Sequence, residues 1–205
     1  MTLSRRTAAL RFLAVSVASW ATAGCDRLPD AVILPEYEFE YSFETTLEGW
    51  NASAADVGAG SWNADSSTER ATVGARSLRI VLANPGGAGK VWVSRKLEVT
   101  ANMRYTVDLS FDLATADHVA ADAWKLIVGA RTSLPAGPSA LDFQGDTSSG
   151  TATTTGAIWV KKRFTLTAQA DDEGSLYLTV GVWGTTPATR SYWIDGVRAV
   201  LTRME

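Results

Sequence analysis

Residues 105–113 (YTVDLSFDL) alternate strictly between apolar and polar side chains. A period of two places the apolar residues on one face and the polar residues on the other, which is typical of a β-strand with one buried face. A single sheet cannot bury such a face by itself, so a second layer must cover it. This pattern therefore favours two packed sheets.

Similar short segments recur along the chain, and residues typical of turns separate them. We expect further strands at 78–82, 91–99, 124–131, 157–167, 176–183 and 191–201. Segments 84–87 and 135–138 predict turns, and the low-complexity segment 145–156 predicts a mobile surface loop. No stretch carries a sustained helical stripe, and no internal repeat is present. The expected fold class is all-β, an antiparallel sandwich or barrel.

Composition excludes several kinds of site. The 205 residues contain 19 basic and 22 acidic residues, one histidine and one cysteine. His118 alone cannot build a multi-histidine metal site, and in its polar context we expect an exposed loop residue. Cys25 alone leaves no intramolecular disulfide. Loss of the first 25 residues, with Arg5, Arg6 and Arg11, changes the net charge from −3 to −6. So acidic a chain does not support nucleic-acid binding.

The N-terminus is predicted to be an export signal. Arg5 and Arg6 precede an apolar stretch at 12–24, whose thirteen residues are too few to span a bilayer. The apolar stretch ends in the segment TAGC at 22–25, which resembles the bacterial lipobox and departs from it at Thr22. We expect residues 1–24 to be a lipoprotein signal peptide and residues 25–39 to be the lipidated Cys25 and a tether. The folded domain is expected at 40–205, anchored in the bacterial cell envelope, in the periplasm or at the cell surface. The alternative is an ordinary signal cleaved near Ala23.

Four blocks in order resemble one family of binding domains. They are FE…GW at 43–50, GARSLRI at 74–80, IWV…FTL at 158–166 and YWIDGV at 192–197. They resemble jelly-roll carbohydrate-binding modules of the cellulose- and xylan-binding type (CenC-like, families 4, 9 and 22). The resemblance implies a two-sheet, galactose-binding-like jelly roll and non-catalytic polysaccharide binding.

The resemblance also implies one structural Ca²⁺, with Glu44 and Asp195 as ligands. Carbonyl oxygens near 45–47 and near Ser77 would complete the site, since Ca²⁺ prefers six to eight oxygen ligands. The first and last strands are commonly neighbours in such a sandwich. The alternative is that both carboxylates are solvated at strand ends, or paired with Arg79 or Arg198.

Tryptophans suggest where a glycan would bind. Trp20 lies in the signal, so seven of the eight tryptophans remain in the mature chain. Aromatic faces stack on the apolar faces of sugar rings, and polar side chains bind the hydroxyl groups. Trp50, Trp124 and Trp159 are expected to pack structurally. The candidate ligand-binding residues are Trp62, Tyr177, Trp183, Trp193, Asp108, Asp112 and Arg131.

These candidates follow from strand alternation and loop context. Tyr177 and Trp183 lie opposite an apolar set on their strand, and Trp193 lies opposite its apolar neighbours. Trp62 falls in a polar loop, where it either binds ligand or covers the core. The alternative for the strand residues is a solvated outer sheet face.

Catalysis is not expected. The compact ExDxxE motif of jelly-roll glucanases is absent from the sequence. Asp108 and Asp112 would lie about 13 Å apart on one strand face, beyond the separation that glycosidases use. The expected function is polysaccharide binding by an exported, lipid-anchored domain. The alternatives are a structural or protein-binding envelope lipoprotein and, third, a glycan-active hydrolase. The glycan and the oligomeric state do not follow from the sequence.

Overall fold

The computed structural model describes residues 36–115, 123–146 and 157–205, and for residues 144–146 it describes the backbone only. The signal peptide, Cys25, His118 and most of the 145–156 loop lie outside the described residues. Ile33–Glu205 form one compact unit, which contains every described residue. No helix in the described part of the chain is long and apolar enough to cross a membrane.

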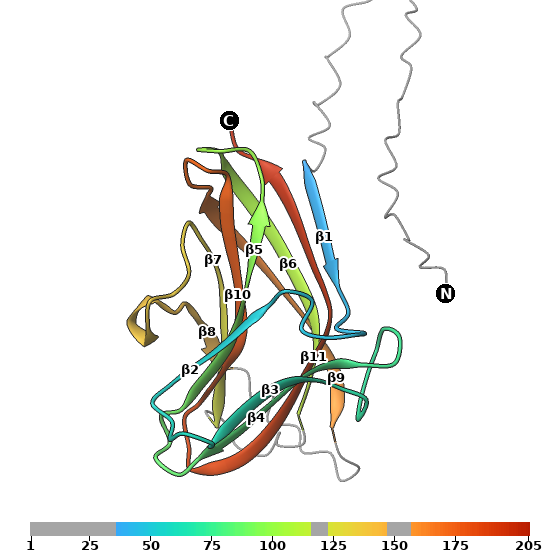
Figure 1. Cartoon of the computed structure of the whole chain (residues 1–205), viewed down its shortest axis with the longest axis vertical. Helices are drawn as coiled ribbons and strands as arrows, with labels where there is room; N and C mark the ends of the chain where they lie inside the picture. Colours follow the sequence, from blue (N-terminus) through green and yellow to red (C-terminus); the bar gives the residue numbers. More distant parts are fainter. Residues whose placement is uncertain (1–35, 116–122, 147–156) are drawn as a thin grey trace, which may run out of the picture. The chain divides into compact units, whose positions relative to one another are not determined.

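Two antiparallel sheets form the domain (Figure 1). The six-stranded sheet has the order β3 (Trp62–Ser67), β4 (Ser77–Asn84), β11 (Ala188–Arg203), β6 (Arg104–Thr115) and β9 (Ile158–Gln169), with β1 (Tyr37–Tyr41) also paired to β11. The five-stranded sheet has the order β2 (Asn51–Ala55), β5 (Lys90–Glu98), β10 (Ser175–Gly184), β7 (Trp124–Arg131) and β8 (Phe143–Asp146). A 3₁₀ turn, η1 (Pro138–Ala140), precedes β8. The all-β sandwich expected from the sequence is confirmed.

The core lies between the two sheets and follows the alternation of the strands. The apolar face of β6 is fully buried, as are Leu176, Leu178, Val180 and Val182 of β10. These residues belong to one continuous cluster, which also contains Trp50 and Trp124. Burial of this apolar surface is the main driving force for folding.

Some strands have sequences that do not predict them. β2 (NASAA) and β3 (WNADSS) contain no β-branched residue, yet β2 pairs with β5 and β3 pairs with β4. Their conformation therefore comes from pairing with apolar neighbours rather than from intrinsic propensity. β1 begins at Tyr37, inside the stretch 25–39 that the sequence analysis assigned to the tether.

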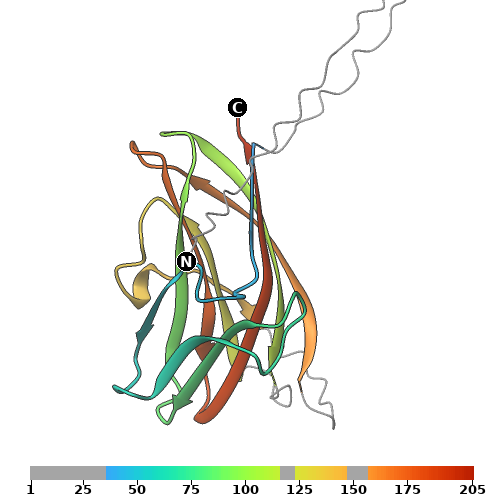
Figure 2. The same ribbon diagram turned by 45° about the vertical axis from the view of Figure 1, so that its right-hand side comes forward.

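The last strand links most of the six-stranded sheet. One half of β11 pairs with β4, and the other half pairs with β1, so the first and last strands are neighbours as expected. Figure 2 shows β11 running the length of the sheet beside the shorter β1. The register of β11 against β6 shifts between Asp195 and Arg198, which marks a β-bulge there.

Candidate functional site

The outer face of the five-stranded sheet carries the aromatic residues predicted for β10. Leu176 and its apolar companions face the core, so Tyr177 and Trp183 lie on the outer face, as the alternation predicted. Register places Arg131 of β7 directly beside Tyr177. The structure thus brings three of the predicted ligand-binding residues onto one face.

Trp183 forms part of an aromatic pair at one end of this face. Its ring lies 4.9 Å from the ring of Phe143 on β8, measured between centroids. The Nζ atoms of Lys90 and Lys125 lie 4.9 Å and 5.4 Å from the Trp183 ring centroid. Phe143 remains 37% exposed, while Trp183 is half-buried against a small apolar cluster around Trp92. Cation–π contacts of this kind hold an aromatic ring in one orientation.

A charged pair lies nearer the other end of the face. Arg131 donates from Nε to Asp142 Oδ2 at 2.9 Å and from Nη2 to Oδ1 at 2.5 Å. The Asp142 carboxylate lies against Gly129, where a Cβ would meet Oδ2 at 2.7 Å. Only glycine leaves room for this carboxylate on the sheet. The pair presents fixed donors and acceptors beside the Tyr177 ring.

Small polar side chains lie between these two ends. Ser94 and Thr179 are opposite each other on β5 and β10, and their hydroxyl oxygens are 3.2 Å apart. Trp183 and Tyr177 are six positions apart on one strand, a span of roughly 20 Å at the usual rise per residue. Sequence reasoning missed Phe143 and Asp142, although an aromatic residue beside an acid in a turn-rich segment was a usable signal.

Asp108 and Asp112 do not join this face, which corrects the single-face grouping of the sequence analysis. Both lie on β6, and their side chains project from the six-stranded sheet on the opposite side of the sandwich. Thr165 donates to Asp108 at 2.7 Å, and Lys161 forms an ion pair with Asp112 at 3.0 Å. Alternation identifies the outward residues of a strand but not the sheet to which the strand belongs.

Trp193 and Trp62 also lie apart from the aromatic face. Trp193 is on the outer side of the six-stranded sheet, as its alternation predicted, but it is only 6% exposed. The guanidinium carbon of Arg70 lies 4.9 Å from its ring centroid. Trp62 begins β3 instead of lying in a polar loop, and it packs against the core opposite Leu82. Of its two expected roles, the structure supports the cover over the core.

The remaining predicted tryptophans show different degrees of burial. Trp50 and Trp124 are buried in the main core, as expected. Trp159 is half-buried on β9, opposite Ala114, with the outward-facing residues of the six-stranded sheet.

Glu44 and Asp195 both bind one loop, residues 68–76. Asp195 is fully buried, and its Oδ2 accepts from the backbone N–H groups of Thr72 at 2.6 Å and Val73 at 2.8 Å. Glu44 Oε1 accepts from the N–H groups of Ala75 and Arg76, each at 3.1 Å. We call this arrangement the carboxylate clasp.

The carboxylate clasp does not fit a calcium ion. Ca²⁺ needs oxygen ligands, whereas amide hydrogens point at these carboxylates. Gly74 has a φ of +68°, and a Cβ there would lie 2.4 Å from Glu44 Oε1, so the loop closes directly onto the carboxylate. In the described part of the chain, no group of three or more His, Cys, Asp or Glu residues could hold a metal. Calcium thus stays a prediction of the family resemblance alone.

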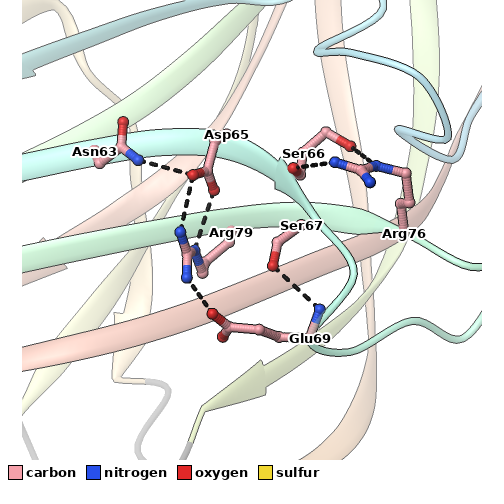
Figure 3. A network of polar contacts seen from close by, with 7 residues as sticks. All are labelled: Asn63, Asp65, Ser66, Ser67, Glu69, Arg76 and Arg79. Carbon is pink, nitrogen blue, oxygen red and sulfur yellow. Dashed lines mark hydrogen bonds and ion pairs between the residues drawn. The ribbon is translucent and has the colours of Figure 1, made fainter.

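Arginines near the clasp have other partners (Figure 3). Arg79 binds Asp65 through Nε and Nη2 and also pairs with Glu69. The hydrogen bond to Asp65 raises the pKa of the Arg79 guanidinium. Arg198 donates to Glu38 at 2.6 Å, and this contact likewise raises its pKa. The structure therefore does not pair Glu44 or Asp195 with either arginine, which was the alternative considered from the sequence.

Comparison with known proteins supports the fold. No protein-family model and no curated protein matches the sequence. The K3 adhesin domain of Lys-gingipain from Porphyromonas gingivalis W83 aligns with a TM-score of 0.53 at 14% identity, covering 78% of this chain and 97% of that domain. The CBM22-1 xylan-binding domain of Paenibacillus barcinonensis Xyn10C aligns at 0.48 and 18% identity, covering 82% and 95%. TmCBM61, solved with β-1,4-galactotriose, aligns at 0.43 and 15% identity, covering 80% and 94%. At 14% identity the likeness to the K3 domain is one of fold alone.

Proposed function

We propose that the outer face of the five-stranded sheet binds a polysaccharide without catalysis. The observation that carries this proposal is the partly exposed Phe143–Trp183 pair on the same face as the Arg131–Asp142 pair. Aromatic rings stack on the apolar faces of sugars, and fixed charged pairs bind their hydroxyl groups. The sequence blocks that resemble carbohydrate-binding modules support the same function.

The layout of the face favours an extended chain rather than a single sugar. Phe143 and Trp183 lie at one end, and Tyr177 lies roughly 20 Å away along the strands. The small residues Ser94 and Thr179 between them leave the floor low, so a ligand can approach the sheet closely. The Asp142 carboxylate on this floor is bound by Arg131.

Affinity electrophoresis of the compact unit Ile33–Glu205 tests the proposal. The gels contain β-glucans, xylans, mannans or host-type glycans. We expect one class to retard the protein. Phe143→Ala and Tyr177→Ala should each weaken that retardation about tenfold, or about 1.4 kcal/mol. Ile158→Ala, an exposed apolar residue at β9, is the matched control and should behave as wild type.

The alternative, a structural or protein-binding envelope lipoprotein, predicts a different result. A folded protein that no glycan retards would favour it, especially if crosslinking in cells then recovers one defined protein partner. Retardation that survives both aromatic substitutions would leave glycan binding intact and place it elsewhere on the molecule.

We infer from the sequence that the protein is exported and anchored through a lipid on Cys25. The support is the TAGC segment after an apolar stretch, since several acyl chains on one cysteine give stable anchoring. Cys25→Ser should move the protein from the membrane fraction to the soluble fraction and abolish incorporation of labelled fatty acid. Unchanged membrane association and no label in the wild type would contradict the anchor.

A further inference from the structure

A hollow of about 550 Å³ lies on the outer face of the six-stranded sheet. Four strands and the clasp loop contribute to it: it is lined by Glu40, Tyr41, Ser42, Val73, Ser110, Lys161, Gly196, Val197 and Arg198. A second hollow of about 340 Å³ adjoins it and shares Ser110 and Arg198. Together they form one groove, the β6–β11 groove, in the size range of small-molecule sites.

The β-bulge in β11 explains why the sheet is hollowed at this point. Gly196 lies within the bulge at a φ of +55° and contributes no side chain, and Ser110 of β6 is small. A Cβ on Gly196 would lie 3.2 Å from Val73 Cγ2, so the clasp loop forms one wall close to the floor. Because Asp195 binds the N–H of Val73, this wall is held in place.

Donors and acceptors alternate across the floor and rim of the groove. One row of the sheet runs from Glu40 through Arg198 and Ser110 to Arg163, across four adjacent strands. The neighbouring rows add Asp108 opposite Thr165 and Asp112 opposite Lys161.

Most of these side chains hold one another in place. Arg198 Nε lies 2.6 Å from Glu38 Oε1 and 3.5 Å from Glu40 Oε1. Lys161 pairs with Asp112, which also accepts from the Thr72 hydroxyl at 3.0 Å. Arg163 forms no ion pair with any residue that the structure describes. A fixed arrangement lowers the entropy that a ligand must overcome on binding.

Charge balance indicates what such a groove would accept. Lys161, Arg163 and Arg198 face four carboxylates, those of Glu38, Glu40, Asp108 and Asp112, so a simple anion or cation meets like charge on one side. Sugar hydroxyl groups both donate and accept hydrogen bonds, which suits interleaved donors and acceptors. Val73, which is 46% exposed on the clasp loop, supplies an apolar contact of the kind that a sugar ring also needs.

We propose that the β6–β11 groove is a second saccharide-binding site, on the face of the sandwich opposite to Phe143 and Trp183. It goes beyond the function proposed above because it uses different residues and a different sheet. With both sites active, one molecule binds two glycan chains.

Filling the groove tests this site. Ser110→Phe places a ring on the floor, and Arg163→Ala removes the unpaired guanidinium. Thr106→Phe is the matched control, since it adds the same ring on the outward face of β6 outside the groove lining. Each variant of Ile33–Glu205 is run in affinity gels with soluble xylan, hydroxyethylcellulose and galactomannan, and its melting temperature is measured.

The site requires that Ser110→Phe and Arg163→Ala weaken retardation by at least one polysaccharide about fivefold or more, with Thr106→Phe unchanged. Tyr177→Ala should retain that component, and the double variant Arg163→Ala/Tyr177→Ala should show both losses together, with weaker retardation than either single variant. If Tyr177→Ala alone abolishes retardation by every polysaccharide tested, the second site is overturned and the first site remains supported. A wild type that none of the three polysaccharides retards overturns both.

Discussion

At the scale of single residues, Asp195 shows how a buried charge is kept in a sheet. A buried carboxylate is costly unless hydrogen bonds satisfy it. Three backbone N–H groups donate hydrogen bonds to its oxygens, and the Thr72 hydroxyl, which also lies within reach of Asp112, is 3.2 Å from Oδ2. Glu44 does the same for the next residues of the loop, so the two carboxylates together hold 68–76 against the sheet.

Removing a carboxylate from the clasp should destabilise the domain without any metal involved. Asp195→Ala removes the acceptor that binds the N–H groups of Thr72, Val73 and Gly196 and should cost about 1–3 kcal/mol, seen as a lower midpoint in urea. EDTA should leave the melting temperature of the wild type unchanged. Asp172→Ala, an exposed turn acid, is the control. A fall in melting temperature with EDTA that excess Ca²⁺ reverses would instead support the calcium ion implied by the family resemblance.

Asp171 gives a pH-dependent contribution. Its Oδ1 accepts from the N–H of Ser175 at 2.6 Å and of Glu173 at 3.0 Å. The hydrogen bond from Ser175 is the main cause that lowers the Asp171 pKa below its ordinary value. A lowered folded-state pKa means that the stabilisation is present above the unfolded-state pKa of about 4 and is lost as pH falls through the folded-state value.

Asp171→Asn should therefore lower stability at pH 7, and the difference from wild type should shrink to nothing in strong acid. Urea unfolding at a series of pH values measures it. A difference that is the same at every pH would show that the ionised carboxylate is not what stabilises this turn.

At the scale of elements, β9 is an edge strand with a charge on its inner side. β9 ends the strand order of its sheet, and Lys162 faces inward opposite the buried Phe111. Burial lowers the pKa of the Lys162 ammonium group. An inward-pointing charge on an edge strand is a known means of discouraging pairing with other chains. We therefore expect Lys162 to lower the stability of the fold and to reduce aggregation through the edge of β9.

Lys162→Met should raise the melting temperature by a few degrees, because about 1 kcal/mol corresponds to roughly 2–4 °C for a domain of this size. Burial destabilises the folded state only while Lys162 is charged, which is why its folded-state pKa is lowered. The gain from Lys162→Met should therefore shrink at high pH, where the lysine loses its charge. The variant should also aggregate more, as light scattering would report. Arg163→Met, on the outward face of the same strand and without an ion pair to any described residue, is the control. A variant that is no more stable than wild type at pH 7 would contradict the argument.

At the scale of the whole molecule, one core supports two outward faces that carry different chemistry. The outer face of the five-stranded sheet carries the Phe143–Trp183 pair, and that of the six-stranded sheet carries the β6–β11 groove with its charged lining. Leu178→Ala, at the centre of β10, should cost about 2–5 kcal/mol through the cavity that it leaves. Because both sheets share this core, the loss should appear as one lower transition by both tryptophan fluorescence and circular dichroism. Exposed Leu134→Ala is the control, and two separate transitions would mean that the sheets unfold independently.

Local pattern was enough to predict the strands that bury a face. The alternation in β6 and β10 identified their buried and outward residues correctly, and Arg131 was correctly grouped with Tyr177. The same reasoning placed Trp62 in a loop, because its polar neighbours hid a strand that only pairing with β4 stabilises. It also joined Asp108 and Asp112 to aromatic residues that belong to the other sheet.

The sequence by itself determined the class of the fold and the inward or outward side of each strong strand, because a period of two is a local property of the chain. The tertiary structure alone decided which strands share a sheet, that Phe143 and Trp183 meet, and that backbone amides face Glu44 and Asp195. Those outcomes depend on pairings between residues far apart in the chain, as with the 122 positions that separate Val73 from Asp195. No local pattern records such distances, since they arise only when the two sheets close over their common core.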